Sequence, residues 1–153
     1  MIKLWPEQLF DGERLLTNHA IWLEGQRIAA IKPACGDEIK LKGLLTAGFI
    51  DCQVNGGDGV LLNDQPTSET IARMLACHAR YGTTSMLPTL ITDSFDKMQQ
   101  AAKAVQQQWL CNPAAIVGIH FEGPHLSVAK KGCLLYTSPS PRDMRRSRMP
   151  SSA

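Results

Sequence analysis

The sequence predicts an α/β fold in which helices cover a parallel β-sheet, preceded by a small β unit. Two observations lead to this prediction. After residue 43, short apolar runs alternate with segments of helical periodicity, in the order strand, helix, strand, helix, strand. Before residue 43, short apolar runs alternate with turn residues. With 153 residues, of which 44% are hydrophobic and 20% charged, the chain has the composition of an ordinary globular domain.

The small β unit is predicted to contain a hairpin. Residues 20–23 and 27–31 are β-rich runs that flank a glycine-containing turn at residues 24–26. Two shorter apolar runs come before it, at residues 2–4 and 9–10. The polar, turn-rich segment at 33–40 is expected to connect this unit to the next one.

Three buried strands are predicted after residue 43. The first lies in LLTAGFIDCQV, where Phe49, Ile50 and Val54 leave neither face polar, as in a parallel strand that is covered on both sides. The second and third are expected at residues 85–90 and 116–120.

Two amphipathic helices are predicted between these strands. Thr67 or Ser68 can cap the first, and Gly82 lies just past its end. Asp93 or Ser94 begins the second. The residues expected on the two buried faces are Ile71, Met74, Leu75 and Ala79 in the first helix, and Met98, Ala101, Ala102, Val105 and Trp109 in the second.

The alternation of strands and helices leaves two architectures open. Three strands cannot close a barrel, and a (β/α)₈ barrel takes about 250 residues. The sheet is therefore either open and doubly wound, or part of an incomplete barrel.

Charge and cysteine content narrow the classes of partner. The net charge is +2, and the arginines after residue 132 account for its positive sign, so no basic surface for nucleic acid is expected. The five cysteines include no CxxC pair and are odd in number, which favours reduced thiols in a cytoplasmic protein. The first residues lack the uninterrupted apolar core of a signal peptide, and no run approaches the length of a membrane span.

Glu122 is the strongest candidate for a functional residue. It follows the third predicted strand, and Gly123 and Pro124 then turn the chain tightly. Ligand sites of parallel α/β folds lie at the carboxyl ends of the strands, so a carboxylate here suits a metal ligand or a general base. The alternative is a loop-edge glutamate that pairs with a lysine or caps a helix. His120 lies two residues earlier. A single histidine in such a position is more often packed or hydrogen-bonded than a metal ligand.

Gln53 and Asn55 alternate along the first strand, so their side chains share a face and can line the site. Alternatively, the two amide side chains form hydrogen bonds with backbone groups of the loop. The glycine-rich loop at 55–59 has no GxGxxG or Walker lysine and is weak evidence for a phosphate site. His19 and His78 are assigned to the surface or to a helix face.

Three segments carry a resemblance to a known family: LLTAGFIDCQVNGGDGVLLND, GTTSMLPTLITDS and GIHFEGPHLSVAKKG. Together they resemble the N-terminal third of the N-acetylglucosamine-6-phosphate deacetylase family, within the amidohydrolase superfamily. The resemblance covers about residues 1–132. It implies a truncated (β/α)₈ TIM-type barrel at 43–132, with three strands and two helices, preceded by part of a small β-sandwich domain at 1–42.

The resemblance also implies a metal site and a reaction. The superfamily has a His-x-His pair on the first barrel strand, and Gln53 and Asn55 at these positions imply that one metal site is lost. The remaining divalent ion, commonly zinc, is held in the family by the glutamate at Glu122 and by two later histidines, and a late aspartate moves the proton. The implied reaction is hydrolysis of N-acetylglucosamine 6-phosphate to acetate and glucosamine 6-phosphate, in a homodimer.

Residues 133–153 are predicted not to belong to the native protein. CLLYTSPSPRD and SRMPSSA resemble two pieces of a translated sequencing adapter in one reading frame. The chain is expected to be inactive alone, because the two histidines and the aspartate lie beyond the resemblance. Two other readings remain: another hydrolase of the superfamily, which Gln53 and Asn55 disfavour, and a non-catalytic sugar-phosphate binding module that uses the loop at 55–59.

Overall fold

The computed structural model describes residues 1–123, which divide into two compact units. The first unit is Met1–Ala47, and the second begins at Gly48. The boundary expected at residues 42 and 43 therefore falls inside strand β5 (Ile39–Leu45), which belongs to the first unit because it pairs in parallel with β1 (Ile2–Phe10). The predicted foreign segment, 133–153, lies outside the described residues.

The first unit is a five-stranded sheet in the order β2-β1-β3-β4, with β5 paired to β1. Its other strands are β2 (Leu15–Leu16), β3 (His19–Glu24) and β4 (Arg27–Pro33). The predicted hairpin is confirmed, because β3 and β4 pair antiparallel and Gly25 turns the chain at φ 59°. The two short runs expected at 2–4 and 9–10 are the two ends of β1, which passes through Pro6 without a break.

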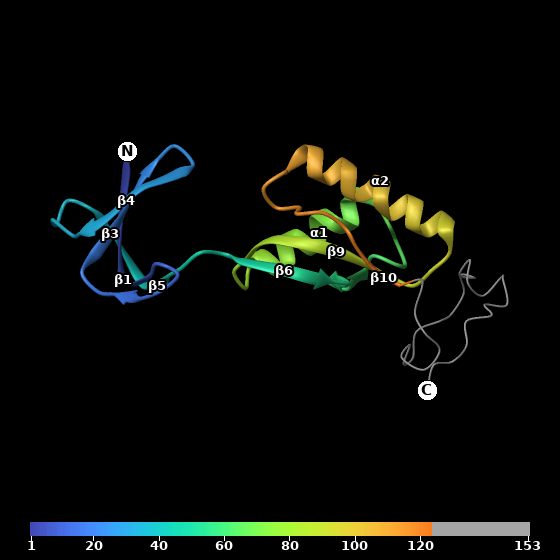
Figure 1. The fold of residues 1–153 in the computed structure, drawn as a ribbon, viewed down its shortest axis with the longest axis horizontal. Helices are drawn as coiled ribbons and strands as arrows, with labels where there is room; N and C mark the ends of the chain where they lie inside the picture. Colours follow the sequence, from blue (N-terminus) through green and yellow to red (C-terminus); the bar gives the residue numbers. More distant parts are fainter. Residues whose placement is uncertain (124–153) are drawn as a thin grey trace, which may run out of the picture. The chain divides into compact units, whose positions relative to one another are not determined.

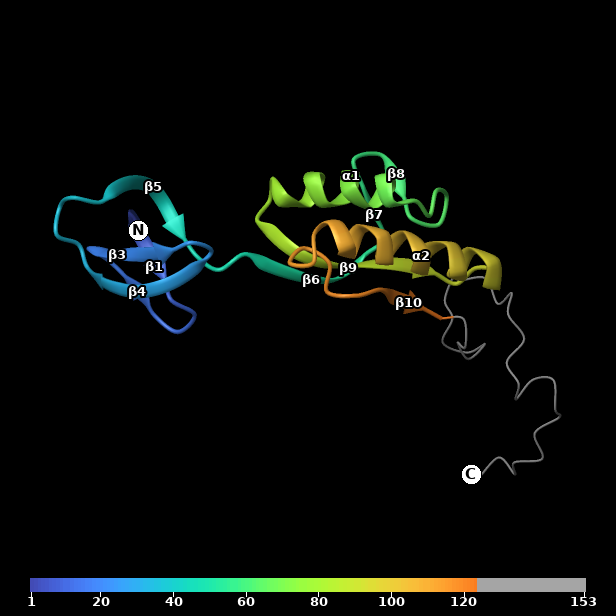
Figure 2. The ribbon, with the colours of Figure 1, turned by 90° about the horizontal axis from the view of Figure 1, so that it is seen from above.

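The second unit confirms the predicted order of strands and helices. Its main elements are β6 (Phe49–Val54), α1 (Ser68–Ala79), β9 (Thr83–Ile91), α2 (Phe95–Cys111) and β10 (His120–Glu122). The three strands form a parallel sheet in the order β10-β9-β6. Both helices lie on one side of this sheet (Figure 1), and a view from above shows them side by side (Figure 2). A short hairpin of β7 (Gly56–Gly57) and β8 (Val60–Leu61) follows β6.

The two helices begin at the predicted caps. The Thr67 side chain accepts a hydrogen bond from the Thr70 N–H, and the Ser94 side chain accepts one from the Lys97 N–H. The core beneath the helices contains the predicted Ile71, Met74, Ala101 and Val105, together with Val54, Leu62, Met86, Leu90, Ala104 and Ile116. No helix among the described residues is long and apolar enough to cross a membrane.

Parts of the predicted helix faces are wrong. Ala104 is buried in α2 in place of Ala102, which is exposed. Positions three and four residues after Ala101 lie on its face of the helix, whereas the next residue is turned about 100° away. Trp109 is 46% exposed, and Ala79 of α1 is also exposed.

The first and third strands also differ from the prediction. Phe49 and Ile50 are 60% and 64% exposed, because among the described residues the helices cover only one side of β6. Ile116 forms an isolated bridge to Met86, and the regular strand begins only at His120, where the predicted one ended.

Candidate functional site

Glu122 is the last residue of β10 and is half-buried at the carboxyl end of the parallel sheet. Gly123 follows with φ 101°, a backbone conformation that strongly favours glycine, so the extended strand conformation ends at Glu122. This edge of a parallel sheet is where α/β proteins place their ligands.

Gln53 and Glu122 meet across the sheet. They stand on β6 and β10, with β9 between them, and are 69 residues apart in the chain. The Gln53 Nε2 donates a hydrogen bond to the Glu122 Oε2 at 3.2 Å. An amide that donates a hydrogen bond to a carboxylate fixes the orientation of that carboxylate.

A bulge in β6 changes the register of the strand at Gln53. Asp51 pairs with Met86 and Val54 pairs with Pro88, so β6 has one more residue than β9 between these pairs. Pro88 has no N–H to donate to the ladder, and prolines inside sheets occur at such irregularities. Bulges redirect side chains next to active sites, and this one contains Gln53.

Two threonine hydroxyls bond to backbone groups beside the site. Thr89 is fully buried, and its Oγ1 accepts from the Val54 N–H at 3.0 Å. Thr92 is also buried, and its Oγ1 donates to the Glu122 carbonyl oxygen at 2.8 Å. Thr89 lies within β9, which continues to Ile91, one residue past the predicted strand. In the sequence, Thr89 directly follows Pro88 within an apolar run, and this pattern was the available signal for its contact.

His120 and Asn55 lie near the pair in different ways. The His120 Nδ1 is 3.2 Å from the carbonyl oxygen of Cys52, so it too reaches across β9 to β6. Asn55 is half-buried, and within residues 1–123 its buried Nδ2 has no hydrogen-bond partner. The structure therefore brings Gln53, His120 and Glu122 together, and holds the Asn55 amide as an unused donor.

Sequence reasoning missed a second polar group at this edge. The Asn63 Nδ2 donates to the Ile91 carbonyl at 2.9 Å and to the Asp93 Oδ2 at 3.1 Å, and its Oδ1 accepts from the Ile91 N–H at 2.9 Å. The Lys97 Nζ lies 3.7 Å from the same Asp93 carboxylate oxygen. Burial opposes the charge of Asp93, but the N–H of Ser94, the Asn63 amide and Lys97 outweigh it and lower its pKa.

The glycine-rich loop at 55–59 is fastened to α1. The His78 Nε2 lies 2.9 Å from the Gly56 carbonyl oxygen, and Arg73 bonds the Asp58 carbonyl at 2.8 Å and its carboxylate at 3.3 Å. His78 therefore has a specific partner, although it stands on a helix as predicted. The carbonyl groups of Gly56 and Asp58 therefore serve to attach the loop to α1.

Glu122 offers a carboxylate oxygen to a metal ion at this edge. No group of three or more His, Cys, Asp or Glu side chains that could hold an ion occurs within residues 1–123. A carboxylate oxygen suits a divalent cation. The Glu122 Oε2 accepts from Gln53, and in the part of the chain that the structure describes its Oε1 has no hydrogen-bond partner. The residues present therefore fit one ligand of a metal site.

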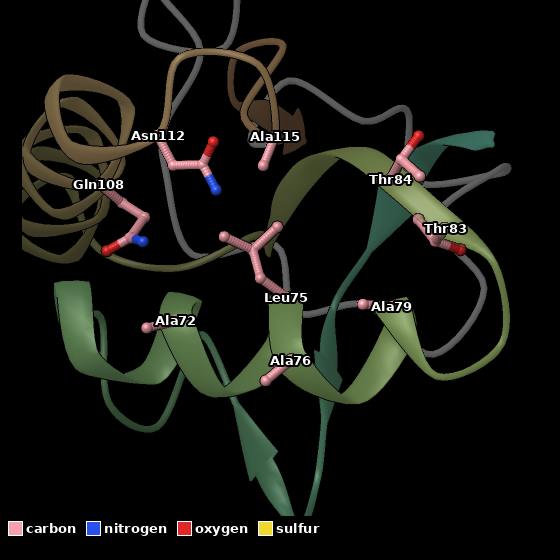
Figure 3. A pocket seen from close by; sticks show the side chains of 9 residues that line it. All are labelled: Ala72, Leu75, Ala76, Ala79, Thr83, Thr84, Gln108, Asn112 and Ala115. Carbon is pink, nitrogen blue, oxygen red and sulfur yellow. The ribbon is translucent and has the colours of Figure 1, made fainter. Parts of the chain in front are cut away.

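An open hollow of about 480 Å³ lies at the other end of β9 (Figure 3). Its walls come from one face of α1, the last turns of α2 and the start of β9. The lining residues are Ala72, Leu75, Ala76, Ala79, Thr83, Thr84, Gln108, Asn112 and Ala115. Because it lies at the amino end of the strand, it is separate from the edge that holds Glu122.

Comparisons with known proteins agree with this arrangement. Residues 44–150 match the model of the amidohydrolase family. The chain is 58% identical over 91 residues to N-acetylgalactosamine-6-phosphate deacetylase of Shewanella sp. (strain ANA-3), covering 60% of this chain and 23% of that protein. It is 37% identical over 124 residues to N-acetylglucosamine-6-phosphate deacetylase of Haemophilus influenzae, covering 77% of this chain and 32% of that protein.

A solved structure shows the same fold. The crystal structure of N-acetylglucosamine-6-phosphate deacetylase from Pasteurella multocida superposes with a TM-score of 0.83 at 33% identity, over 92% of this chain and 40% of that one. The chain thus spans less than half the length of each of these relatives. The family match runs into residues 133–150, so their predicted foreign origin stays a prediction.

Proposed function

Because this chain belongs to the amidohydrolase family, we propose that the full-length protein containing it hydrolyses the N-acetyl group of N-acetylglucosamine 6-phosphate. The products are acetate and glucosamine 6-phosphate. The likeness to the deacetylases of H. influenzae and P. multocida supports this reaction. The contact between Gln53 and Glu122 is the observation that carries it, because it assembles a polar site at the expected edge of the sheet.

We further propose that β6, β9 and β10 are the first three strands of a (β/α)₈ TIM-type barrel. Their parallel pairing in sequence order supports this, since neighbouring strands of such a barrel follow one another in the chain. The first unit would then be part of the small β-sandwich that the resemblance implies.

The site is proposed to hold one divalent metal ion, zinc, with Glu122 as one ligand. Amidohydrolases are generally metal-dependent, and the Glu122 Oε1, which has no hydrogen-bond partner within residues 1–123, suits the ion. When bound, such an ion would polarise the acetyl carbonyl and lower the pKa of a water molecule. Gln53 orients the Glu122 carboxylate, and the unused Asn55 donor is available to a substrate group. The other ligands and the proton-transferring aspartate are expected on later strands.

N-acetylgalactosamine 6-phosphate is a second candidate substrate. The 58% identity to the Shewanella enzyme favours it. The two sugars differ only in the configuration of the C4 hydroxyl, so one pocket has to discriminate a single hydrogen-bonding group. The ratio of kcat/KM for the two phosphorylated sugars, measured with the full-length protein, decides between them.

Glu122→Gln in the full-length protein tests the proposed metal role. The amide has nearly the same shape as the carboxylate but lacks its charge, so bound metal should be lost and kcat/KM should fall by about 100-fold or more. Metal content and acetate release measure this. Glu24→Gln, at the exposed end of β3 in the first unit, is the matched control.

Two outcomes would contradict the proposal. The first is a Glu122→Gln protein that retains both metal and turnover. The second is a wild-type protein that binds the sugar phosphate equally well after treatment with a chelator and releases no acetate, which would favour the binding-module reading.

Cytoplasmic localisation and a homodimeric state are also proposed. Cysteine usage supports the first, and the family resemblance supports the second. Fractionation of the native cells and sedimentation of the full-length protein test them.

A further inference from the structure

We propose that Thr89 and Thr92 are positioning residues that set the separation and orientation of Gln53 and Glu122. Both stand at the carboxyl end of β9, the strand that separates the two, and each bonds to the backbone of a different neighbouring strand. The inference rests on the proposed function, because it assigns a purpose to the geometry of that site.

Thr92 acts on the side of β10. The last ladder pair between β9 and β10 joins Ile91 to Glu122, so regular pairing ends at the carboxylate residue itself. Thr92 is the next residue of the chain and is 8% exposed, and its hydroxyl donates to the Glu122 carbonyl at 2.8 Å. This bond holds the backbone from which the Glu122 carboxylate projects.

Thr89 acts on the side of β6. Its hydroxyl accepts from the Val54 N–H at 3.0 Å and donates to the Leu87 carbonyl at 3.1 Å, so it both accepts and donates. Val54 directly follows Gln53 and closes the bulge. The hydroxyl thus anchors the backbone next to Gln53, where the ladder is irregular.

Neither hydroxyl is needed for packing. Valine has nearly the shape of threonine, suits a strand at least as well, and carries no polar atom into the core. At Thr89, which is 0% exposed, valine would leave the Val54 N–H without its partner. The structure therefore assigns the hydroxyls to backbone positioning.

Valine and serine substitutions in the full-length protein test this. Thr92→Val and Thr89→Val remove the hydroxyl, whereas Thr92→Ser and Thr89→Ser keep it. The dissociation constant of zinc should rise about 10- to 100-fold in the valine variants, as when groups that orient metal ligands are lost. The serine variants should stay close to wild type, and KM for the sugar phosphate should change less than kcat.

Thr83→Val is the matched control. It makes the same substitution on the same strand at the opposite end, and no hydrogen bond of the Thr83 side chain occurs within the described residues. The control should bind zinc like wild type. If a valine variant fails to fold, as a thermal melt would reveal, the alanine variant at that position decides in its place.

Each outcome has a distinct meaning. Wild-type zinc affinity in the folded valine variants, or a loss in the serine variants as large as in the valine variants, overturns the inference and leaves the proposed function intact. A wild-type protein that neither binds zinc nor releases acetate overturns the proposed function and the inference with it. Protection of the Val54 amide from hydrogen exchange in wild type, lost in Thr89→Val but kept in Thr89→Ser, supports the inference without any metal.

Discussion

Asn63 uses both ends of its side-chain amide at the carboxyl end of β9. It pairs with the N–H and the carbonyl of Ile91 as a neighbouring strand would, and it also donates to Asp93. One side chain therefore ties the loop after β6 to the loop after β9. The charge of Asp93 is part of this connection, because a neutral carboxyl accepts hydrogen bonds more weakly.

Asp93 should make the stability of the protein depend on acid pH. Its pKa lies below the ordinary value of 3.8 in the folded state: burial opposes the charge, but Ser94, Asn63 and Lys97 outweigh it. A lowered pKa stabilises the fold above the unfolded value, and this contribution is lost as the pH falls through the folded pKa. Asp93→Asn should therefore lower stability at neutral pH and flatten its decline below about pH 4.

Urea unfolding of both proteins between pH 2 and pH 7 measures this effect. The control is Asp96→Asn, which removes an exposed carboxylate from the first turn of α2, three residues after Asp93. Parallel stability curves for wild type and Asp93→Asn at all pH values would contradict the assignment.

At the scale of elements, the β7–β8 hairpin is tightly packed. A Cβ at Gly56 would lie 2.2 Å from the Val60 carbonyl oxygen, which belongs to the backbone and cannot rotate away. The Gly56 carbonyl in turn contacts His78 of α1. The hairpin thus depends on one residue without a side chain, directly after Asn55.

Gly56→Ala should displace the hairpin and destabilise the fold by about 1–3 kcal/mol, as overpacking does. Gly118→Ala is the comparison, because its new Cβ would meet only the end of the Leu87 side chain, at 3.2 Å. Chemical denaturation gives both values. An equal or larger loss of stability in Gly118→Ala would contradict this account.

Local signals were sufficient for most elements and for one site residue. Helix caps such as Ser94 act within three residues, and Glu122 was found because a glycine and a proline follow it. Contacts between distant segments could not be predicted from such signals. The Val54 N–H bonds a residue 35 positions away, and Gln53 bonds one 69 positions away. The prediction of Ala102 as a core residue was wrong because Ala101, Ala102 and Ala104 are alike in sequence, and alanine alone does not show which face of the helix is buried.

At the scale of the whole molecule, large apolar side chains remain on the surface of both units. In the first unit these include Ile28, Ile39 and Leu44, and in the second Phe49 and Ile50. Large apolar side chains that stay exposed favour association or coverage by further protein where they gather.

The 153-residue chain should therefore bind a hydrophobic dye and associate as its concentration rises. Phe49→Thr with Ile50→Thr, which keeps residues suited to a strand, should reduce both effects. Light scattering and dye fluorescence measure them, with Ser85→Thr in β9 as the control. The expectation that this chain alone neither folds stably nor turns over substrate stays a prediction, which a cooperative melt with acetate release would contradict.

The contact between His120 and the Cys52 carbonyl determines where the imidazole carries its proton. A carbonyl oxygen can only accept, so Nδ1 must be protonated, and in the neutral ring Nε2 then keeps its lone pair. In that neutral form the ring offers an acceptor at Nε2 and no second donor. A sugar hydroxyl could donate a hydrogen bond to this nitrogen. An unprotonated phosphate oxygen could not, because it too is only an acceptor.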